Sequence, residues 1–183
     1  MKKMKQILTI LFFMVSVPVL FAQVNADCNI KYNLFKGDYK AKKYDAAYEN
    51  WLWCMDNCPT LSINIYKLGV KIAESKLDSA SEADKPAARD MVMRVYEQRL
   101  KYYPKGFGYV YDKIATFKAE HGASEEEVFN WIDKAFKEDV TEVSPRNIYQ
   151  YFDIILKKYK DSDAQKVFDT YDEVGAGIEL KRE

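Results

Sequence analysis

The chain has 183 residues, and its 28 Lys and Arg balance its 28 Asp and Glu, so the formal net charge at pH 7 is zero. No long basic stretch follows the N-terminus, which argues against a protein that binds nucleic acid. Aromatic residues make up 15% of the chain. A chain of this composition buries enough apolar surface to offset the entropy of ordering, which argues against a disordered protein.

The N-terminal segment has the pattern of a secretory signal peptide. Three lysines among the first five residues precede an apolar run, residues 7–21, and Ala22 supplies the small residue at a cleavage site. The run is short for a membrane span of about 20 residues and contains Pro18, so we expect cleavage rather than an uncleaved anchor. Residues 1–22 are then removed, and residues 23–183 form an exported domain without a membrane span.

Helical periodicity repeats along the mature chain, with Gly and Pro as punctuation and few strand signals between. We therefore expect an all-α fold of about eight helices, which short loops join into antiparallel hairpins. The expected hairpins are residues 27–59, 60–104, 105–140 and 144–175.

Three of the later helices have recognisable starts. Ser124 followed by Glu127 is a capping box, and Ser144-Pro145 places a cap before a first-turn proline. The last helix is expected to begin near Ser162. Glycines at its other end lead us to expect that it frays there, around Gly175 and Gly177.

Large aromatic residues recur at a nearly constant interval along the chain. Trp51, Tyr96, Trp131 and Phe168 are separated by 45, 35 and 37 positions. A helical-hairpin repeat of about 34 residues fits this spacing if the second unit carries about 11 extra residues. The polar stretch at 79–85 is the expected place for that insertion.

The second predicted helix and the one after it resemble tetratricopeptide repeats (TPRs). Leu68-Gly69 followed by Ile72 is similar to the start of one repeat. Five residues before it fall at the offsets of the second half of a repeat: Tyr44, Ala47, Trp51, Cys54 and Pro59. The resemblance implies a right-handed solenoid of stacked hairpins. The signal peptide and the Asn-Cys-Pro sequence are similar to those of exported Bacteroidetes-type TPR proteins, which implies the periplasm or cell envelope of a Gram-negative bacterium.

The three cysteines are expected to form one disulfide in an oxidising compartment and to leave one thiol. Cys28 opens the first predicted helix and Cys58 closes the second, so an antiparallel hairpin brings these two sulfurs together. Cys54 and Cys58 are four apart on one helix, and a bond between them would need distortion. We therefore favour Cys28–Cys58, with another pairing or no bond as the alternatives. A redox-active Cys-x-x-x-Cys lacks the spacing of thioredoxin-like sites.

In TPR folds the first helix of each hairpin lines a concave groove that holds peptides or partner helices. The positions implied for this groove are aromatic, and tyrosine suits binding because it combines a large area with a polar tip. The alternative is that these tyrosines are half-buried packing residues. The candidates are Tyr32, Tyr39, Tyr66, Tyr109 and Tyr149.

Catalytic, metal and cofactor sites have no visible signature in the sequence. The one histidine, His121, lies beside Gly122 at a predicted helix end, far in sequence from the cysteines. The acidic run at 125–127 falls in the first turn of a helix, where the macrodipole favours negative charge. Residues 106–108 lack the Lys-Ser/Thr of a phosphate loop.

These observations predict a non-enzymatic scaffold of the cell envelope that holds a protein or peptide in a concave aromatic groove, with no cofactor. One alternative is a carbohydrate- or small-ligand-binding helical protein that uses the aromatic faces for stacking. Another is an enzyme on an α/α scaffold, which would require paired carboxylates in a pocket.

Overall fold

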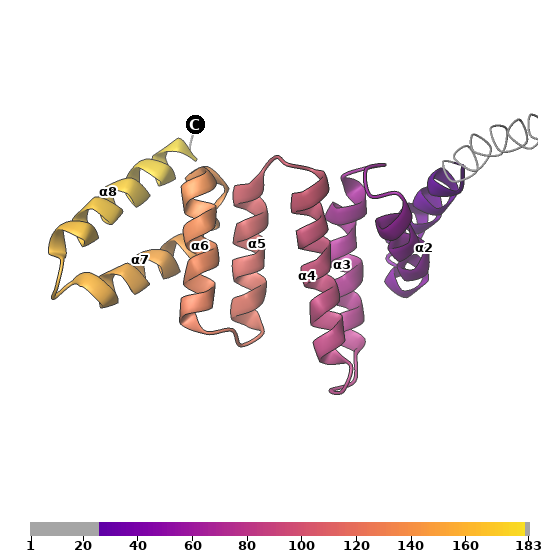
Figure 1. Ribbon diagram of the computed structural model, residues 1–183, viewed down its shortest axis with the longest axis horizontal. Helices are drawn as coiled ribbons and strands as arrows, with labels where there is room; N and C mark the ends of the chain where they lie inside the picture. Colours follow the sequence, from indigo (N-terminus) through magenta and orange to yellow (C-terminus); the bar gives the residue numbers. More distant parts are fainter. Residues whose placement is uncertain (1–25, 182–183) are drawn as a thin grey trace, which may run out of the picture. The chain divides into compact units, whose positions relative to one another are not determined.

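The computed structural model describes residues 26–181, and every regular element in that range is helical (Figure 1). The all-α class expected from the sequence is therefore confirmed. The signal peptide expected at 1–22 lies outside the described residues. Within residues 26–181, no helix has both the length and the apolar character needed to cross a membrane. The elements are a first helix at 26–40, α2 (Tyr44–Asn57), α3 (Asn64–Ser79), α4 (Lys85–Tyr102), α5 (Phe107–Glu120), α6 (Glu125–Asp139), η1 (a 3₁₀ turn, Val140–Glu142), α7 (Pro145–Tyr159) and α8 (Ala164–Leu180).

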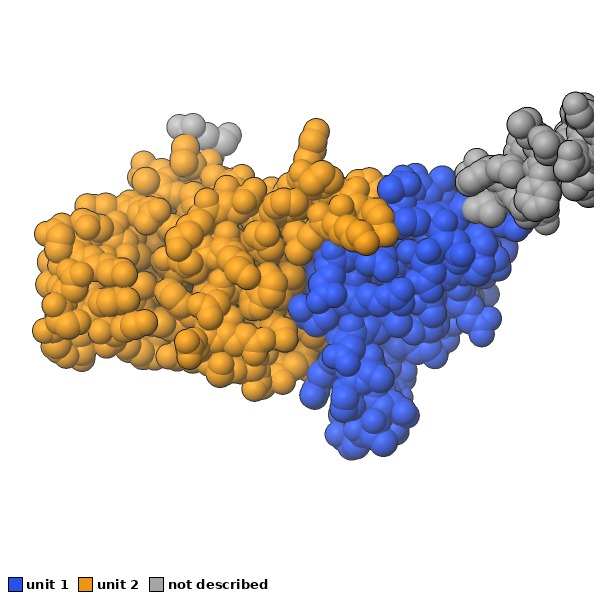
Figure 2. All heavy atoms as spheres, in the orientation of Figure 1, with its two compact units in different colours: residues 1–98 blue, residues 99–183 orange. Residues whose placement is uncertain are grey.

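The chain divides into two compact units, which Figure 2 shows in different colours. Unit 1 comprises residues 1–98 and unit 2 comprises residues 99–183, so the division falls within α4. Unit 1 holds the first helix, α2, α3 and most of α4. Unit 2 holds α5 to α8 and η1.

The core of unit 1 forms around Trp51 of α2, which is fully buried. Its indole Nε1 donates a hydrogen bond of 2.7 Å to the carbonyl oxygen of Ile65 in α3. Gly69, one turn further along α3, lies directly against the indole, and a Cβ there would be 2.7 Å from its Cε2. Only glycine permits this approach, so Gly69 of α3 leaves the space that the Trp51 indole of α2 fills.

Cys28 and Cys58 form the disulfide that the hairpin argument favours, with Cα atoms 5.9 Å apart. The bond joins the start of the first helix to the end of α2. Its loop, a sequence separation of 30, stabilises the fold by about 3–4 kcal/mol in the chain-entropy model. Cys54 is free and buried, and burial raises the pKa of its thiol to about 11. The thiol is therefore protonated at neutral pH, which makes it a packing residue rather than a nucleophile.

The expected cap at the start of α6 forms only in half. The Ser124 hydroxyl accepts a hydrogen bond of 3.2 Å from the backbone N–H of Glu127. The Glu127 carboxylate, however, turns to Lys118 of α5, whose ammonium lies 2.8 Å away. At the start of α7, Ser144 caps the backbone N–H of Asn147 as expected, at 3.4 Å. Ser124 therefore caps α6, while Glu127 links α6 to α5.

The expectation that the last helix frays around Gly175 and Gly177 is wrong, because α8 continues through both to Leu180. Gly177 is buried against Val140 of η1, and a Cβ on it would lie 2.9 Å from one Val140 methyl carbon. The Lys181 ammonium donates a hydrogen bond to the Val143 carbonyl. Contacts with η1 therefore hold this end of α8 in the helix.

Candidate binding pocket between α7 and α8

In unit 1 the structure places the three predicted groove tyrosines in packing roles. Tyr32 and Tyr39 are half-buried, and the Tyr32 hydroxyl lies 3.1 Å from the Ser62 Oγ. Tyr66 is only 1% exposed, and its hydroxyl donates a hydrogen bond of 3.0 Å to the Pro59 carbonyl. Tyr66 is thus a core residue and not part of an exposed groove, because its ring fills the interior of unit 1.

In unit 2 both predicted tyrosines are exposed. Tyr109 of α5 is 50% exposed, with the Lys113 ammonium 5.2 Å from its ring centroid. Tyr149 of α7 is 74% exposed and lies on the wall of a pocket. Among the five candidates, Tyr149 is the one that lines this pocket.

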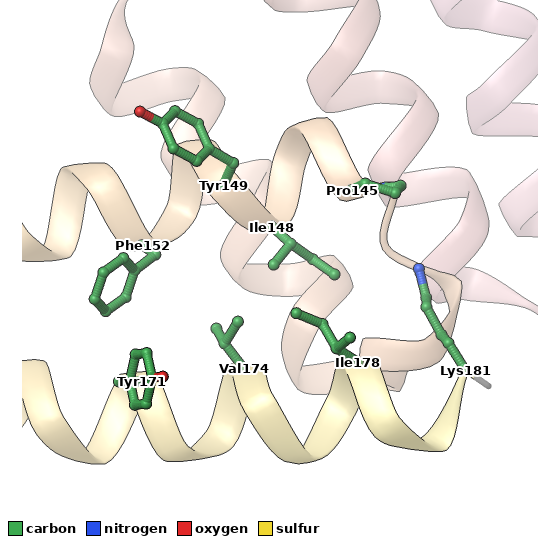
Figure 3. A pocket seen from close by; sticks show the side chains of 8 residues that line it. All are labelled: Pro145, Ile148, Tyr149, Phe152, Tyr171, Val174, Ile178 and Lys181. Carbon is green, nitrogen blue, oxygen red and sulfur yellow. The ribbon is translucent and has the colours of Figure 1, made fainter. Parts of the chain in front are cut away.

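The pocket lies between α7 and α8 and has a volume of about 430 Å³ (Figure 3). It is open on one side, and its lining is almost wholly apolar. Most of that lining comes from three residues of each helix: Ile148, Tyr149 and Phe152 of α7, and Tyr171, Val174 and Ile178 of α8.

Helical spacing explains why these residues share one pocket. Tyr171, Val174 and Ile178 are three and four positions apart and form one stripe along α8. In Figure 3 this stripe faces α7, and the Phe152 side chain points toward Tyr171. The centroids of these two rings are 6.0 Å apart, and the rings meet edge to face. Two bulky aromatic residues thus separate the helices at this level.

A buried carboxylate that the sequence did not suggest positions α7. Asp112 of α5 is 1% exposed and accepts hydrogen bonds of 2.8 Å from the backbone N–H and from the hydroxyl of Ser144. The Asn147 side-chain amide donates a third hydrogen bond to the same oxygen, at 2.7 Å. The negative charge therefore satisfies donors at the N-terminus of α7, where the helix dipole favours an anion. Asp112 fixes the start of one wall of the pocket.

The pocket offers an apolar surface with few polar atoms. Lys181 also lines it, and its ammonium donates a hydrogen bond to the Val143 carbonyl. Across residues 26–181, no cluster of three His, Cys, Asp or Glu side chains could hold a metal ion. An apolar cleft with aromatic walls suits an aliphatic or aromatic side chain.

Sequence reasoning named Tyr149 but not its partners in the pocket. One signal for them was present in the sequence: Val167, Tyr171, Val174 and Ile178 follow helical spacing along α8, and Phe168 lies beside that stripe. A wide apolar face indicates either a buried helix or a helix that binds something. The sequence alone does not say which side is covered.

Comparison of this chain with protein-family models, with curated proteins and with solved structures finds no match. No relative therefore supplies a function for the α7–α8 pocket.

Proposed function

We propose that the protein is a non-enzymatic binding module of the cell envelope, which holds a protein or peptide partner by inserting apolar side chains into the α7–α8 pocket. The observation that carries this proposal is the pocket itself. It is apolar, open to solvent and walled by Tyr149 and Tyr171, which are 74% and 63% exposed. Exposed apolar surface of this kind is costly to maintain and marks interaction sites.

Two further observations support the architecture and location in this proposal. The α2 helix carries the TPR-like residues, and the recurring aromatic positions fit a TPR-like stack of hairpins. The Cys28–Cys58 disulfide suits an oxidising compartment, as expected for a protein exported to the periplasm or envelope.

The composition of the pocket favours a peptide over a carbohydrate. Sugar hydroxyls lose their hydrogen bonds to water on binding and need polar partners in the site. The α7–α8 pocket offers almost none, because its lining is nearly all carbon. An aliphatic or aromatic side chain of a peptide has no such requirement.

Selection from a displayed peptide library against the purified chain tests the proposal. We expect apolar peptides whose dissociation constants, measured by fluorescence anisotropy, rise at least tenfold with Tyr171→Asp. A charge next to Phe152 opposes burial of an apolar ligand. Tyr109→Asp is the matched control, because Tyr109 is also half-exposed on a helix but lies outside the pocket.

We expect Tyr109→Asp to leave the affinity unchanged. A library that yields no peptide sensitive to Tyr171→Asp would overturn the proposal. Specific glycan binding that Tyr171→Asp abolishes would replace it with the carbohydrate alternative.

A further inference from the structure

The contact between α6 and α7 shows how unit 2 receives a neighbouring helix. Tyr151 of α7 lies between two phenylalanines of α6, with ring centroids 5.2 Å from Phe129 and 4.8 Å from Phe136. Its hydroxyl donates a hydrogen bond of 3.1 Å to the Asp133 carboxylate. The α6 helix therefore accepts a tyrosine through two aromatic rings and a carboxylate.

The α8 helix carries two of these three accepting residues in the same register. The side chains of Ser124 and Asp163 cap α6 and α8, each accepting a hydrogen bond from the backbone N–H three residues on. Counted from its cap, Phe168 of α8 stands at the position that a phenylalanine occupies in α6. Asp172, four residues later, stands at the position of the aspartate that accepts the tyrosine hydroxyl.

The two pairs differ in what covers them. In α6 the phenylalanine is half-buried under α7, and the side chain of Asp133 is only 24% exposed. In α8, Phe168 is 65% exposed and Asp172 is also exposed. Phe168 precedes Tyr171 of the pocket by one helical turn, and both Phe168 and Asp172 lie beside the pocket lining rather than in it. The α8 face thus has one accepting ring and the carboxylate, with Gly175 at the position of Phe136, and it lacks the helix that covers this position in the preceding hairpin.

We propose that the α7–α8 face binds an amphipathic α-helix of a partner protein. The partner presents a tyrosine that stacks on Phe168 and donates its hydroxyl to Asp172, and its flanking aliphatic side chains enter the pocket. The inference rests on the proposed function and names the partner's chemistry: a helix with the spacing of Ile148, Tyr151 and Ile155.

A second copy of this chain does not supply such a helix. The α7 stripe has the required spacing, but its three residues are buried in the core of their own unit, at 5%, 7% and 3% exposure. The α7 helix of a second copy is therefore not the occupant, and the partner proposed above is a helix of another protein. In the helix-in-groove mode of recognition, affinity comes from apolar anchors at this spacing.

A stapled, fluorescently labelled helix with the sequence of residues 145–159 is the probe, because this chain already docks it on an equivalent face. Binding to the full mature chain is measured by anisotropy. We expect saturable binding that Phe168→Ala weakens about tenfold, since the stacked ring and its buried area are lost. Tyr109→Ala, which removes another exposed ring of unit 2, is expected to have no effect.

The Asp172 contact is tested by a double-mutant cycle. We expect Asp172→Asn to weaken the tyrosine probe about threefold and to leave a probe with phenylalanine in place of Tyr151 unchanged. Equal losses for both probes would overturn the assigned hydrogen bond. Binding that does not respond to Phe168→Ala would overturn the docking site, including the case in which the probe displaces α7 from α6.

The inference and the proposed function can fail separately. Library peptides that depend on Tyr171 but not on Phe168 would support a binding pocket and overturn the helical partner. If the helical probe does not bind and the library selection also yields no peptide, both the helical partner and the binding pocket are overturned. Self-association that Phe168→Ala abolishes, measured by analytical ultracentrifugation, would make a second copy the occupant and overturn the separate partner.

Discussion

Unit 2 contains two hairpins made of helices of similar length, and one is closed while the other holds a pocket. The closed hairpin, α5–α6, has fully buried alanines at Ala115 and Ala135. At Gly108 an added Cβ would lie 3.2 Å from the backbone of the last residue of α6. In the open hairpin, Phe152 and Tyr171 meet instead. Small residues let helices approach closely, whereas facing aromatic residues hold them apart.

The difference also affects how much each hairpin contributes to stability. The exposed apolar residues of α8 contribute little to the free energy of unfolding, because water still reaches them. Buried residues of α5–α6 contribute more to the free energy of unfolding, because they gain both the full free energy of transfer from water and close packing. A fold can therefore place its stability in one hairpin and leave the adjacent one available for a partner.

The largest effect is expected for an isoleucine in the closed hairpin. Ile132 of α6 is 0% exposed, whereas Ile178 in the α8 wall is 39% exposed. We expect Ile132→Ala to lower the free energy of unfolding by about 3 kcal/mol through lost burial and a residual cavity. Ile178→Ala should cost less than about 1 kcal/mol. Urea denaturation followed by circular dichroism measures both, and equal losses would contradict the division between the hairpins.

The next largest loss of stability is expected for Asp112, the carboxylate of α5 that binds the start of α7. Asp112→Ala leaves the backbone N–H and the hydroxyl of Ser144 without their acceptor, whereas the Asn147 amide keeps the Asp112 carbonyl and the Thr116 hydroxyl. We expect a loss of about 2–3 kcal/mol in the free energy of unfolding. Asp153 of α7, whose side chain is 34% exposed and paired with exposed Lys157, is the control. Asp153→Ala should cost no more than about 0.5 kcal/mol. A reversed order would show that Asp112 does not hold α7.

Two glycines of α8 test what keeps the open hairpin attached to η1. Gly177→Ala places a methyl group against Val140, and we expect it to cost about 2 kcal/mol in the free energy of unfolding. A Cβ on Gly175 meets no atom within 4 Å. Gly175→Ala should therefore stabilise the protein by about 0.5 kcal/mol through helix propensity. Thermal melts of the two variants should move in opposite directions, and a shared direction would contradict the contact.

The smallest effect is expected for the tyrosine that docks α7 on α6. Tyr151→Phe removes the hydrogen bond to Asp133 and should cost about 1 kcal/mol in the free energy of unfolding near neutral pH. Burial, reinforced by the Asp133 charge, raises the pKa of Tyr151 above its ordinary value of 10.0. The stabilisation from this shift is present below pH 10 and is lost as pH rises further, because the unfolded chain ionises first.

The wild-type protein should therefore lose stability more steeply than Tyr151→Phe above pH 10. Urea midpoints at pH 8 and pH 11 measure the difference. Parallel losses in the two proteins would show that the Tyr151 phenol ionises as readily in the folded state as in the unfolded state.

Local signals in the sequence were sufficient for the helices and for one covalent link. The Ser124 and Ser144 caps act on backbone N–H groups three residues away, so a short window of sequence contains the whole interaction. The Cys28–Cys58 pairing needed only the knowledge that two adjacent helices run antiparallel. The extent of α8 was missed because Gly177 is held by a valine in another element.

The site residues depended on contacts between distant parts of the sequence. Tyr66 and Tyr149 have similar neighbours along the chain, yet the first is 1% and the second 74% exposed. Asp112 lies between a tyrosine and a lysine, which suggests an exposed position, and it is buried because the start of α7 brings donors to it.

The sequence by itself determined an all-α chain and the caps of its later helices, and it favoured the disulfide that the structure contains, because these follow from interactions within one helix or one hairpin. Only the tertiary structure decided which apolar faces are covered. Coverage depends on how closely neighbouring helices approach, and small residues in α5–α6 and aromatic residues in α7–α8 set that distance differently. The pocket and the uncovered Phe168 follow from that difference.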